Sequence, residues 1–292
     1  IFDQADYHDA LQLLLEKKTL RQVAKSFVYN LSDYPSRGVN MRGMSDHNIQ
    51  IISHGKVIGE LDPIGARGTL YKDAIYQHLG RKYLSLELNL EQKTCTVTPI
   101  NADYYTEAVW QSTVSHTEVV ASQTINQSTL NFGIVHVNKQ PKIYKKIKEK
   151  TLDNIGYGPI TLSPFIYDTM GFSLIPAHAW VVFIYNIDKR LISTAFYGLS
   201  YILKNTVPSL TMGDIKDVDT DVSLSIKDVT NWKISLFLYD THEGGVGYAE
   251  KAFEKFKEIL CFIKEIISEC ECSSGCPACI PPIPPGIDDD SL

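Results

Sequence analysis

The spacing of hydrophobic residues changes twice along the chain of 292 residues. Residues 6–28 carry apolar side chains at helical spacing, as Leu11 and Leu15 do. Residues 38–137 instead alternate between apolar and polar positions, or run apolar over short stretches that glycine and polar turns separate. After Gly156, strand-like and helix-like segments follow each other. The pattern predicts a helical start, a β-rich middle and a mixed final part.

Individual elements can be predicted within this outline. Residues 87–99 suit a hairpin, because two strand-like segments flank the turn sequence Glu91-Gln92-Lys93. In the final part we predict a buried strand at residues 179–185, a helix at 191–203, a strand at 232–239 and a long amphipathic helix at 248–268.

The predicted fold class is mixed, between α+β and α/β, with three domains. Residues 1–35 suit the end of a small helical, winged-helix-like module, although an ordinary helical pair on a larger body fits the pattern equally well. Residues 36–150 are expected to form a β-rich domain. Residues 151–292 are expected to form an α/β domain, closed by a four-cysteine zinc knuckle and followed by a proline-rich exit.

Composition narrows the class of protein. With 44% hydrophobic and 21% charged residues the chain is typical of a globular protein. Its net charge of −6 gives no overall attraction to nucleic acid or to an anionic membrane, so any such binding needs a local basic patch. The first residues lack an initiator methionine and a signal peptide. We therefore expect a piece of a larger cytoplasmic protein.

Four of the six cysteines lie close together near the end, in the spacing C-x-C-x3-C-x2-C, as Cys270, Cys272, Cys276 and Cys279. Four thiolates at turns rich in glycine and proline suit a tetrahedral zinc ion. Disulfides fit poorly, since cysteines this close in sequence rarely meet the required geometry. An iron–sulfur cluster or free thiols remain alternatives, because four thiolates also ligate such clusters.

A glycine-rich loop, hereafter the glycine loop, covers residues 239–250 with the sequence YDTHEGGVGYAE. A strand, a glycine turn and a helix in this order can present backbone N–H groups to an anion. The spacing matches neither a dinucleotide fingerprint nor a Walker A loop. A tight turn that allows close packing of the strand and the helix is the simpler interpretation.

Residues 139–150 form the one strongly basic run, KQPKIYKKIKEK. A solvated linker or helix face is the simpler interpretation, and a surface that contacts phosphates is the functional one. The sequence shows no catalytic set. Ser200 has no nucleophile-elbow context, and the aspartates of residues 214–221 lack the pattern of a calcium loop, so a solvated acidic turn is expected there.

Three segments together resemble a known family. Residues 78–108, the glycine loop within FLYDTHEGGVGYAEKAFEKF, and the cysteine spacing are similar to the C-terminal region of MrfA-type, YprA-like superfamily 2 helicases. The segment KDAIY, at residues 72–76, departs from the family's Pro-Gly-Ala-Ile-Tyr, and Glu243 stands where many members have proline.

The resemblance implies a C-terminal, DNA-guiding region of an ATP-dependent 3′–5′ DNA helicase that acts in DNA repair or phage defence. Zinc would be its structural cofactor, with the four cysteines as ligands, while ATP and Mg²⁺ would act only in motor domains outside this chain. The partners would be single-stranded or forked DNA and RecA-like helicase domains or a helicase subunit. The family's signature loop corresponds to Tyr239, Asp240, Gly244, Gly245 and Gly247.

Two hypotheses follow. In the first, the chain guides DNA, and we expect phosphate contacts from Lys142, Lys145, Lys146, Arg67 and Lys72. In the second, the chain is a non-enzymatic, zinc-stabilised accessory subunit that docks a helicase without touching DNA. The chain lacks Walker motifs, so we expect no ATPase activity from it alone.

Overall fold

The computed structural model describes residues 4–24, 26–30, 48–228 and 230–280. The chain divides into two compact units, Ile1–His47 and Asn48–Leu292, which are described separately below.

The first unit contains one helix and one hairpin among its described residues. Helix α1, Gln4–Glu16, is followed by strands β1, Leu20–Val23, and β2, Ser26–Tyr29, which pair antiparallel. The helical spacing predicted up to residue 28 is therefore wrong beyond α1. The sequence Ser-Phe-Val-Tyr of β2 consists mostly of residues that favour strands, and this preference decides the local structure. The winged-helix-like character of this unit stays a prediction, and residues 36–47, the first part of the predicted β-rich domain, lie outside the described residues.

The second unit begins with a small sheet of five described strands in the order β4-β3-β7-β6-β5. Strands β3 and β7 are parallel, and the other neighbours are antiparallel. The bounds are β3 Ile49–Ser53, β4 Lys56–Leu61, β5 Ile75–His78, β6 Arg81–Asn89 and β7 Thr94–Pro99. Helix α2, Pro63–Thr69, begins where the Asp62 carboxylate accepts hydrogen bonds from two backbone N–H groups. The hairpin predicted at residues 87–99 is confirmed as β6 and β7.

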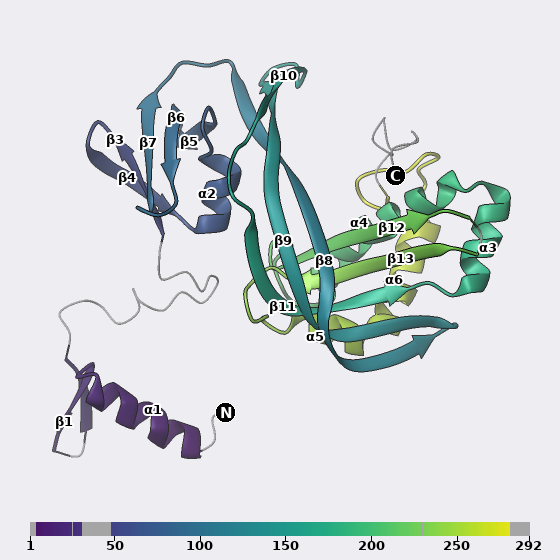
Figure 1. Cartoon of the computed structure of the whole chain (residues 1–292), viewed down its shortest axis with the longest axis horizontal. Coiled ribbons are helices and arrows are strands. Elements are labelled where there is room, and N and C mark those ends of the chain that lie inside the picture. Colours follow the sequence, from purple (N-terminus) through teal and green to yellow (C-terminus); the bar gives the residue numbers. More distant parts are fainter. Residues whose placement is uncertain (1–3, 25, 31–47, 229, 281–292) are drawn as a thin grey trace. The chain divides into compact units, whose positions relative to one another are not determined.

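A larger antiparallel sheet follows, built on two very long strands. Figure 1 shows β8 and β9 running as one hairpin from the helix-covered part of the sheet up to β10. One edge of β9 pairs with β8, and the other edge pairs first with β11 and then with β10. Beyond β11 come β13 and β12. The bounds are β8 Tyr104–Ile125, β9 Ser128–Lys148, β10 Asn154–Pro159, β11 Phe165–Ile175, β12 Val218–Ile226 and β13 Trp232–Asp240.

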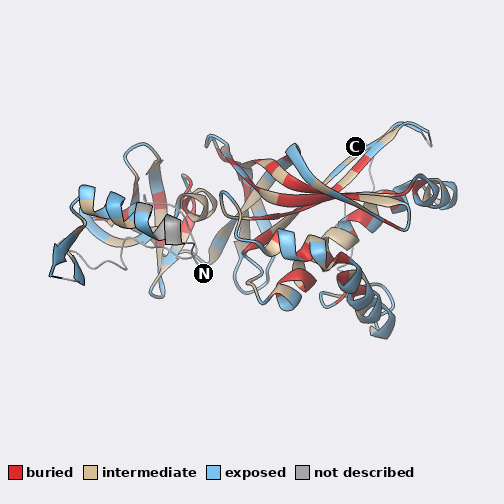
Figure 2. Cartoon of the chain, turned by 90° about the horizontal axis from the view of Figure 1, so that it is seen from below, coloured by how far each residue is buried: buried red, intermediate tan, exposed pale blue. Residues whose placement is uncertain are grey.

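The larger sheet is buried on both faces over part of its area. One face packs against helices α3 His178–Ile187, α4 Arg190–Thr211, α5 Tyr248–Glu254 and α6 Phe256–Glu269. The other face carries a smaller cluster that includes Val135, Val137 and Tyr167. Figure 2 shows the buried residues concentrated along the middle of the sheet and on the helix sides that face it. The mixed α+β fold class, with a β-rich middle, is confirmed.

Two predicted elements are wrong. Residues 179–185 form most of helix α3 rather than a strand, although valine, isoleucine and aromatic residues favour strands. The helix lies against α4 and buries Val181 there, so tertiary packing overrides the local preference. The basic run at residues 139–150 is strand β9 up to Lys148 rather than a linker or a helix.

Other predictions are refined. The helix predicted at residues 191–203 and the strand predicted at 232–239 are confirmed as α4 and β13. The long helix predicted at residues 248–268 is two helices that meet at Lys255. The larger sheet spans the domain boundary predicted at residue 150, because β9 pairs with both β10 and β11. A sequence pattern marks single strands but not which strands pair.

Candidate metal centre and nucleic-acid interface

The four clustered cysteines bring their thiol groups together after the end of α6. The sulfur atoms of Cys270 and Cys272 lie 3.3 Å apart, and those of Cys276 and Cys279 lie 3.7 Å apart. All four lie within 4.8 Å of one another. A tetrahedral zinc ion with bonds of about 2.3 Å places its sulfur ligands about 3.8 Å apart, whereas a disulfide needs about 2.05 Å. The geometry therefore fits one zinc ion rather than disulfides.

Local backbone structure makes this arrangement possible. Gly275 has a left-handed backbone with φ of 88°, which turns the chain between the second and third cysteines. The N–H of Cys279 donates to the carbonyl of Cys276, which closes a tight turn around the last pair. We call residues 270–279 the knuckle.

The knuckle is packed on α4. The Tyr201 hydroxyl donates a hydrogen bond of 2.7 Å to the carbonyl of Pro277. Beside it, Ile280 approaches so closely that a side chain at Gly198 would come within 3.0 Å of it. Since the knuckle also continues directly from α6, it ties the end of α6 to the middle of α4.

In the glycine loop, a carboxylate of the protein itself takes up the backbone N–H groups that could bind an anion. Asp240, fully buried at the end of β13, accepts hydrogen bonds from the N–H groups of Val246, Gly247 and Ala249 at 2.6 to 2.8 Å. These are the N–H groups at the start of α5 that an external anion would need. Asp240 thus stabilises the start of α5, and the geometry supports the tight-turn interpretation.

Steric constraints explain why glycine occupies three positions of this loop. Gly244, Gly245 and Gly247 all have positive φ angles, a region that side chains rarely adopt. A side chain at Gly245 would also come within 2.7 Å of the Met170 side chain on β11. Tyr239, the first residue of the loop, is fully buried and belongs to the sheet.

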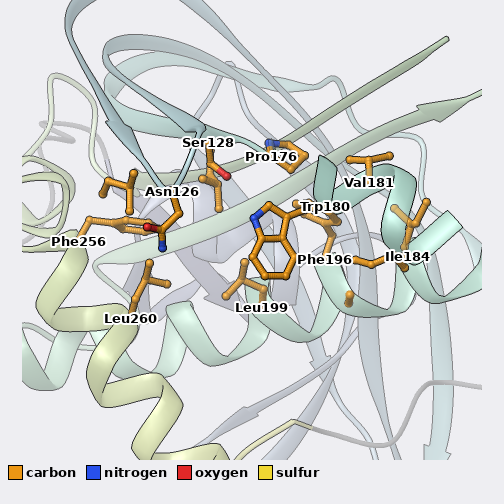
Figure 3. A pocket seen from close by; sticks show the side chains of 14 residues that line it. Asn126, Ser128, Pro176, Trp180, Val181, Ile184, Phe196, Leu199, Phe256 and Leu260 are labelled. Atoms are coloured by element: carbon orange, nitrogen blue, oxygen red, sulfur yellow. The ribbon is translucent and has the colours of Figure 1, made fainter. Parts of the chain in front are cut away.

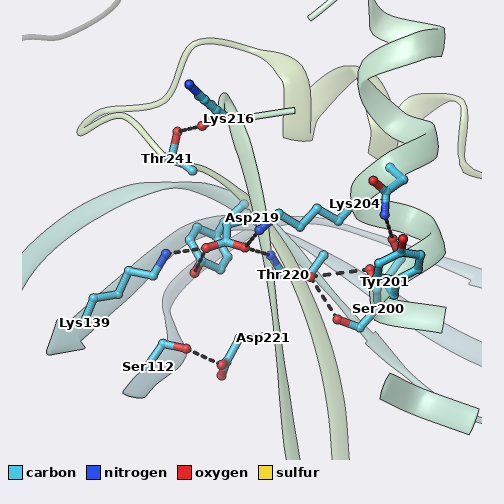
Figure 4. Close-up of polar contacts among 12 residues, drawn as sticks. Ser112, Lys139, Ser200, Tyr201, Lys204, Lys216, Asp219, Thr220, Asp221 and Thr241 are labelled. Atoms are coloured by element: carbon cyan, nitrogen blue, oxygen red, sulfur yellow. Dashed lines mark hydrogen bonds and ion pairs between the residues drawn. The ribbon is translucent and has the colours of Figure 1, made fainter. Parts of the chain in front are cut away.

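A charged network lies on the sheet face opposite the helices. Asp219 on β12 accepts from Lys139 of β9 and, at 2.6 Å, from Lys204 of α4, as Figure 4 shows. Next to it, Asp221 accepts a hydrogen bond of 2.7 Å from Ser112 of β8. The solvated acidic turn predicted at residues 214–221 is therefore wrong for these two aspartates. The strand alternation of β12 turns both of them onto one face.

The pKa values of the two carboxyl groups are shifted in opposite directions. Burial alone would raise the pKa of Asp219, but the ammonium groups of Lys139 and Lys204 outweigh burial and lower it. Burial raises the pKa of Asp221, with the negative charge of Asp219 adding to the effect against the Ser112 hydrogen bond. Because Asp219 is engaged by two lysines, this network is an internal ion cluster. Among the described residues, the four cysteines form the one cluster of three or more groups placed to hold a metal ion.

Strand β9 separates the predicted DNA-contacting lysines. Residues 143–148 pair continuously with β8, so neighbouring side chains point to opposite faces. Lys145 therefore lies on one face and Lys146 on the other, where its ammonium group lies 5.8 Å from the centre of the Tyr104 ring. Lys142 is exposed at an irregularity of the pairing with β8. The three lysines border one strand but do not form a single patch.

The remaining two predicted contacts lie near the junction of the two sheets. Arg67 on α2 places its guanidinium 5.3 Å from the centre of the Phe165 ring and donates to the carbonyl of Pro63. Burial lowers the pKa of Arg67. Lys72, between α2 and β5, is exposed. The structure gives Arg67 a packing role between α2 and β11.

An apolar cavity of about 400 Å³ lies between the helices and the end of the β8–β9 hairpin. Figure 3 shows Trp180 and Ile184 of α3, Phe196 and Leu199 of α4 and Leu260 of α6 around it. The outer side of α3 is apolar as well, since Trp180, Phe183 and Ile187 are each more than half exposed. The sequence pattern does not reveal this surface, because residues 179–185 have the composition of a buried strand.

Comparison with known proteins identifies the last part of the chain. Residues 199–280, from the middle of α4 to the knuckle, match the MrfA Zn-binding domain. Residues 199–280 are therefore similar to this domain family. This match and the four-thiol geometry assign a structural zinc ion to the chain.

Longer relatives extend the match beyond the MrfA Zn-binding domain. The chain is 30% identical over 287 residues to the ATP-dependent helicase YprA of Bacillus subtilis, which covers 96% of the chain and 37% of YprA. It is 23% identical over 274 residues to the ATP-dependent helicase HRQ1 of Saccharomyces cerevisiae, covering 85% of the chain and 24% of HRQ1. The resemblance to MrfA-type, YprA-like helicases is confirmed.

A solved structure agrees with this relationship. The DUF1998 helicase MrfA, crystallised bound to DNA, matches with a TM-score of 0.59 and 30% identity over 94% of this chain and 36% of MrfA. The chain thus spans about a third of the length of YprA and MrfA. Within its described residues, no helix is both long and apolar enough to cross a membrane.

Proposed function

We propose that the chain is the C-terminal, DNA-guiding region of an ATP-dependent 3′–5′ DNA helicase, in DNA repair or phage defence, with Cys270, Cys272, Cys276 and Cys279 as its zinc ligands. The observation that carries the proposal is the match along almost the whole chain to YprA and to MrfA, which was crystallised with DNA. ATP and Mg²⁺ would act in motor domains that this chain does not include.

The zinc site has a structural part in this proposal. Thiolate binding to zinc contributes folding free energy, and the knuckle holds α6 against α4. The same helices pack on the first part of β9, so the zinc site stabilises the sheet to which the lysine-bearing strand belongs.

The DNA contacts in this proposal come from β9 and its surroundings. Lys145, Lys146 and Lys142 lie along one strand, with Lys72 as a further exposed cation. Such lysines would neutralise phosphates along a single-stranded or forked DNA, and binding would weaken as salt rises.

A binding measurement with a charge-matched control tests this function. The anisotropy of a labelled (dT)20 oligonucleotide would be followed with the 292-residue chain, with Lys145→Glu/Lys146→Glu, and with Lys257→Glu/Lys264→Glu on α6, whose lysines are exposed. We expect the β9 variant to weaken binding at least tenfold at low salt and the α6 variant to bind as the wild type does. Absence of wild-type binding, or equal losses in both variants, would contradict the proposal.

The apolar outer side of α3 favours a second candidate, an accessory subunit that docks a helicase. Exposed Trp180, Phe183 and Ile187 form a patch of the kind that marks protein contacts. A helicase pulldown that is insensitive to salt, abolished by Phe183→Asp, and accompanied by no affinity for (dT)20 would decide for this candidate.

A further inference from the structure

The part of the larger sheet farthest from the knuckle-bearing helices has two unlike faces. We call it the arm and define it as residues 104–109 of β8, 143–148 of β9 and the whole of β10. Even-numbered residues of the β8 and β9 parts of the arm face the small sheet, where Tyr144 stacks on Tyr71 at 5.2 Å between ring centres. Odd-numbered residues of these two strand segments face away from it, and Tyr157 of β10, the register partner of Lys145, lies on the same outward face.

The outward face of the arm is unusually apolar for exposed residues. Tyr157 of β10 is 63% exposed, and Tyr105 of β8 and Ile143 of β9 are also exposed. Aromatic and aliphatic side chains gathered on an open face mark a binding surface.

Cross-strand register places a cation at the centre of this face. Lys145 pairs with Tyr157 on one side and with Glu107 on the other, so the three side chains form one row across the arm. Tyr105 pairs with Ile147, one row further along. With strands about 4.8 Å apart and a rise of about 3.3 Å per residue, the two tyrosines stand about 12 Å apart, as two separate positions.

The backbone under Tyr157 is held in place from the other side. The Tyr144 ring lies directly over Gly158, where a side chain would come within 2.3 Å of it. Because the buried Tyr144 and Gly158 fix the strand, Tyr157 is presented on a rigid support, which lowers the entropy cost of binding.

Charge distinguishes nucleic acid from a protein partner as the occupant. Residues 104–109 and 142–159, the arm with its turns, contain five lysines and three carboxylates, a net charge of +2 in a chain of net charge −6. On the outward face Lys145 stands beside the exposed Tyr157 and Tyr105, and this combination suits single-stranded nucleic acid, since stacking needs unpaired bases and a phosphate needs a cation.

We propose that the outward face of the arm is a stacking platform for single-stranded DNA, in which Tyr157 and Tyr105 stack on bases and Lys145 contacts the phosphate between them. This inference rests on the proposed function and adds the residues that discriminate unpaired from paired DNA. Glu107, at the far end of the row, repels phosphates and so directs the DNA backbone toward the Tyr157 side of Lys145.

The test compares two probes and matched tyrosine variants of the 292-residue chain. The probes are labelled (dT)20 and a labelled 20-base-pair duplex, and binding is followed by anisotropy at low salt. The variants are Tyr157→Ala, Tyr157→Trp and, as the control, Tyr197→Ala, since Tyr197 is an exposed tyrosine on α4. We expect Tyr157→Ala to weaken (dT)20 binding at least about fivefold and duplex binding less than twofold. Tyr157→Trp and Tyr197→Ala should both bind (dT)20 as the wild type does.

Salt dependence separates the aromatic from the ionic contribution. Tyr157→Ala should leave the slope of log affinity against log salt unchanged, whereas Lys145→Ala should reduce it by about 0.7. An unchanged (dT)20 affinity in Tyr157→Ala, with the loss in Lys145→Glu/Lys146→Glu intact, would overturn the platform and leave the proposed function standing. Equal losses for duplex and (dT)20 would also overturn it. A wild-type chain that binds neither probe would remove the proposed function and the platform together.

Discussion

The glycine loop and the arm both carry groups that could bind a phosphate, and they differ in where those groups point. In the loop, three N–H groups at the start of α5 are taken by the buried carboxylate of Asp240. In the arm, Tyr157 and its neighbours face solvent above a fixed backbone. A sequence motif therefore acts as a binding site only where the fold leaves its polar groups without an internal partner.

The same contrast separates the knuckle and the Asp219 network from the arm. The cysteines face one another, and Asp219 faces two lysines, so both stabilise the fold from within. Substitutions there should lower stability, and substitutions on the arm should change binding with little effect on stability.

Loss of the knuckle should have the largest effect. Cys276→Ser/Cys279→Ser should reduce bound zinc from about one ion per chain to none, as measured by mass spectrometry of the metal. The same variant should lose the contact between α6 and α4, because zinc binding contributes to the folding free energy. Cys261→Ser is the control, because Cys261 is exposed on α6 outside the cluster. Iron in place of zinc, or full zinc retention in the double variant, would contradict the assignment.

Removal of the Asp240 carboxylate should have the second-largest effect on stability. Asp240→Ala leaves three N–H groups without their acceptor, that of Ala249 buried and those of Val246 and Gly247 partly buried, and should lower the free energy of unfolding by about 3 kcal/mol. Chemical denaturation measures this change. Asp153→Asn, an exposed aspartate next to the arm, should change it by less than about 0.5 kcal/mol. A stable Asp240→Ala variant that gained affinity for inorganic phosphate would instead make the loop an anion site.

The Asp219 network should give a smaller, pH-dependent effect. The pKa of Asp219 in the folded protein lies below its unfolded value of about 3.9. The stability that the Asp219 carboxylate contributes is therefore fully present at pH values above the unfolded pKa, and it is lost as the pH falls through the folded pKa. Asp219→Asn should lower stability by about 2 kcal/mol at neutral pH, since it leaves two lysines without their partner.

The pH profile provides the internal check for Asp219. The difference in stability between wild type and Asp219→Asn, measured by denaturation, should shrink as pH falls below about 4. A difference that stays constant down to pH 2 would show that charge is not its cause. Asp221→Asn should be neutral or slightly stabilising at neutral pH, because burial and Asp219 raise the pKa of Asp221.

The smallest expected effect is on the arm. Glu107→Gln removes the carboxylate opposite Lys145 and should raise affinity for (dT)20 about two- to threefold at low salt, with stability unchanged. The gain should vanish near 1 M salt, where charges are screened within about 3 Å. A gain that persists at high salt would point to a change of shape rather than of charge.

Local spacing explains which parts of the site the sequence could predict. The four cysteines lie within ten residues and are joined by tight turns, so their spacing alone indicates a shared ion. The glycine loop was equally visible, but its spacing left an anion site and a tight turn open. Asp240 belongs to the loop, but only the folded structure shows that its carboxylate accepts from the N–H groups at the start of α5, because β13 ends beside α5.

Other parts depend on strand pairing, which a single sequence does not reveal. The network of Asp219, Lys139 and Lys204 joins β12, β9 and α4 across separations of 15 and 80 residues. The basic run looked like a linker because lysines interrupt its alternation, yet strands on both sides of β9 supply its hydrogen-bond partners. Helix α3 shows the reverse error, since a strand-like composition gives way to packing against α4.

The sequence by itself determined the zinc cluster, the helicase relationship and the mixed fold class, because each depends on residues close together or on a motif. The tertiary structure decided which groups are satisfied internally and which face solvent. It turned Lys145 and Lys146 to opposite faces, buried Asp219 between lysines, and placed Tyr157 on an open face. The physical reason is that pairing and burial join residues far apart in the chain, whereas spacing reports only on neighbours.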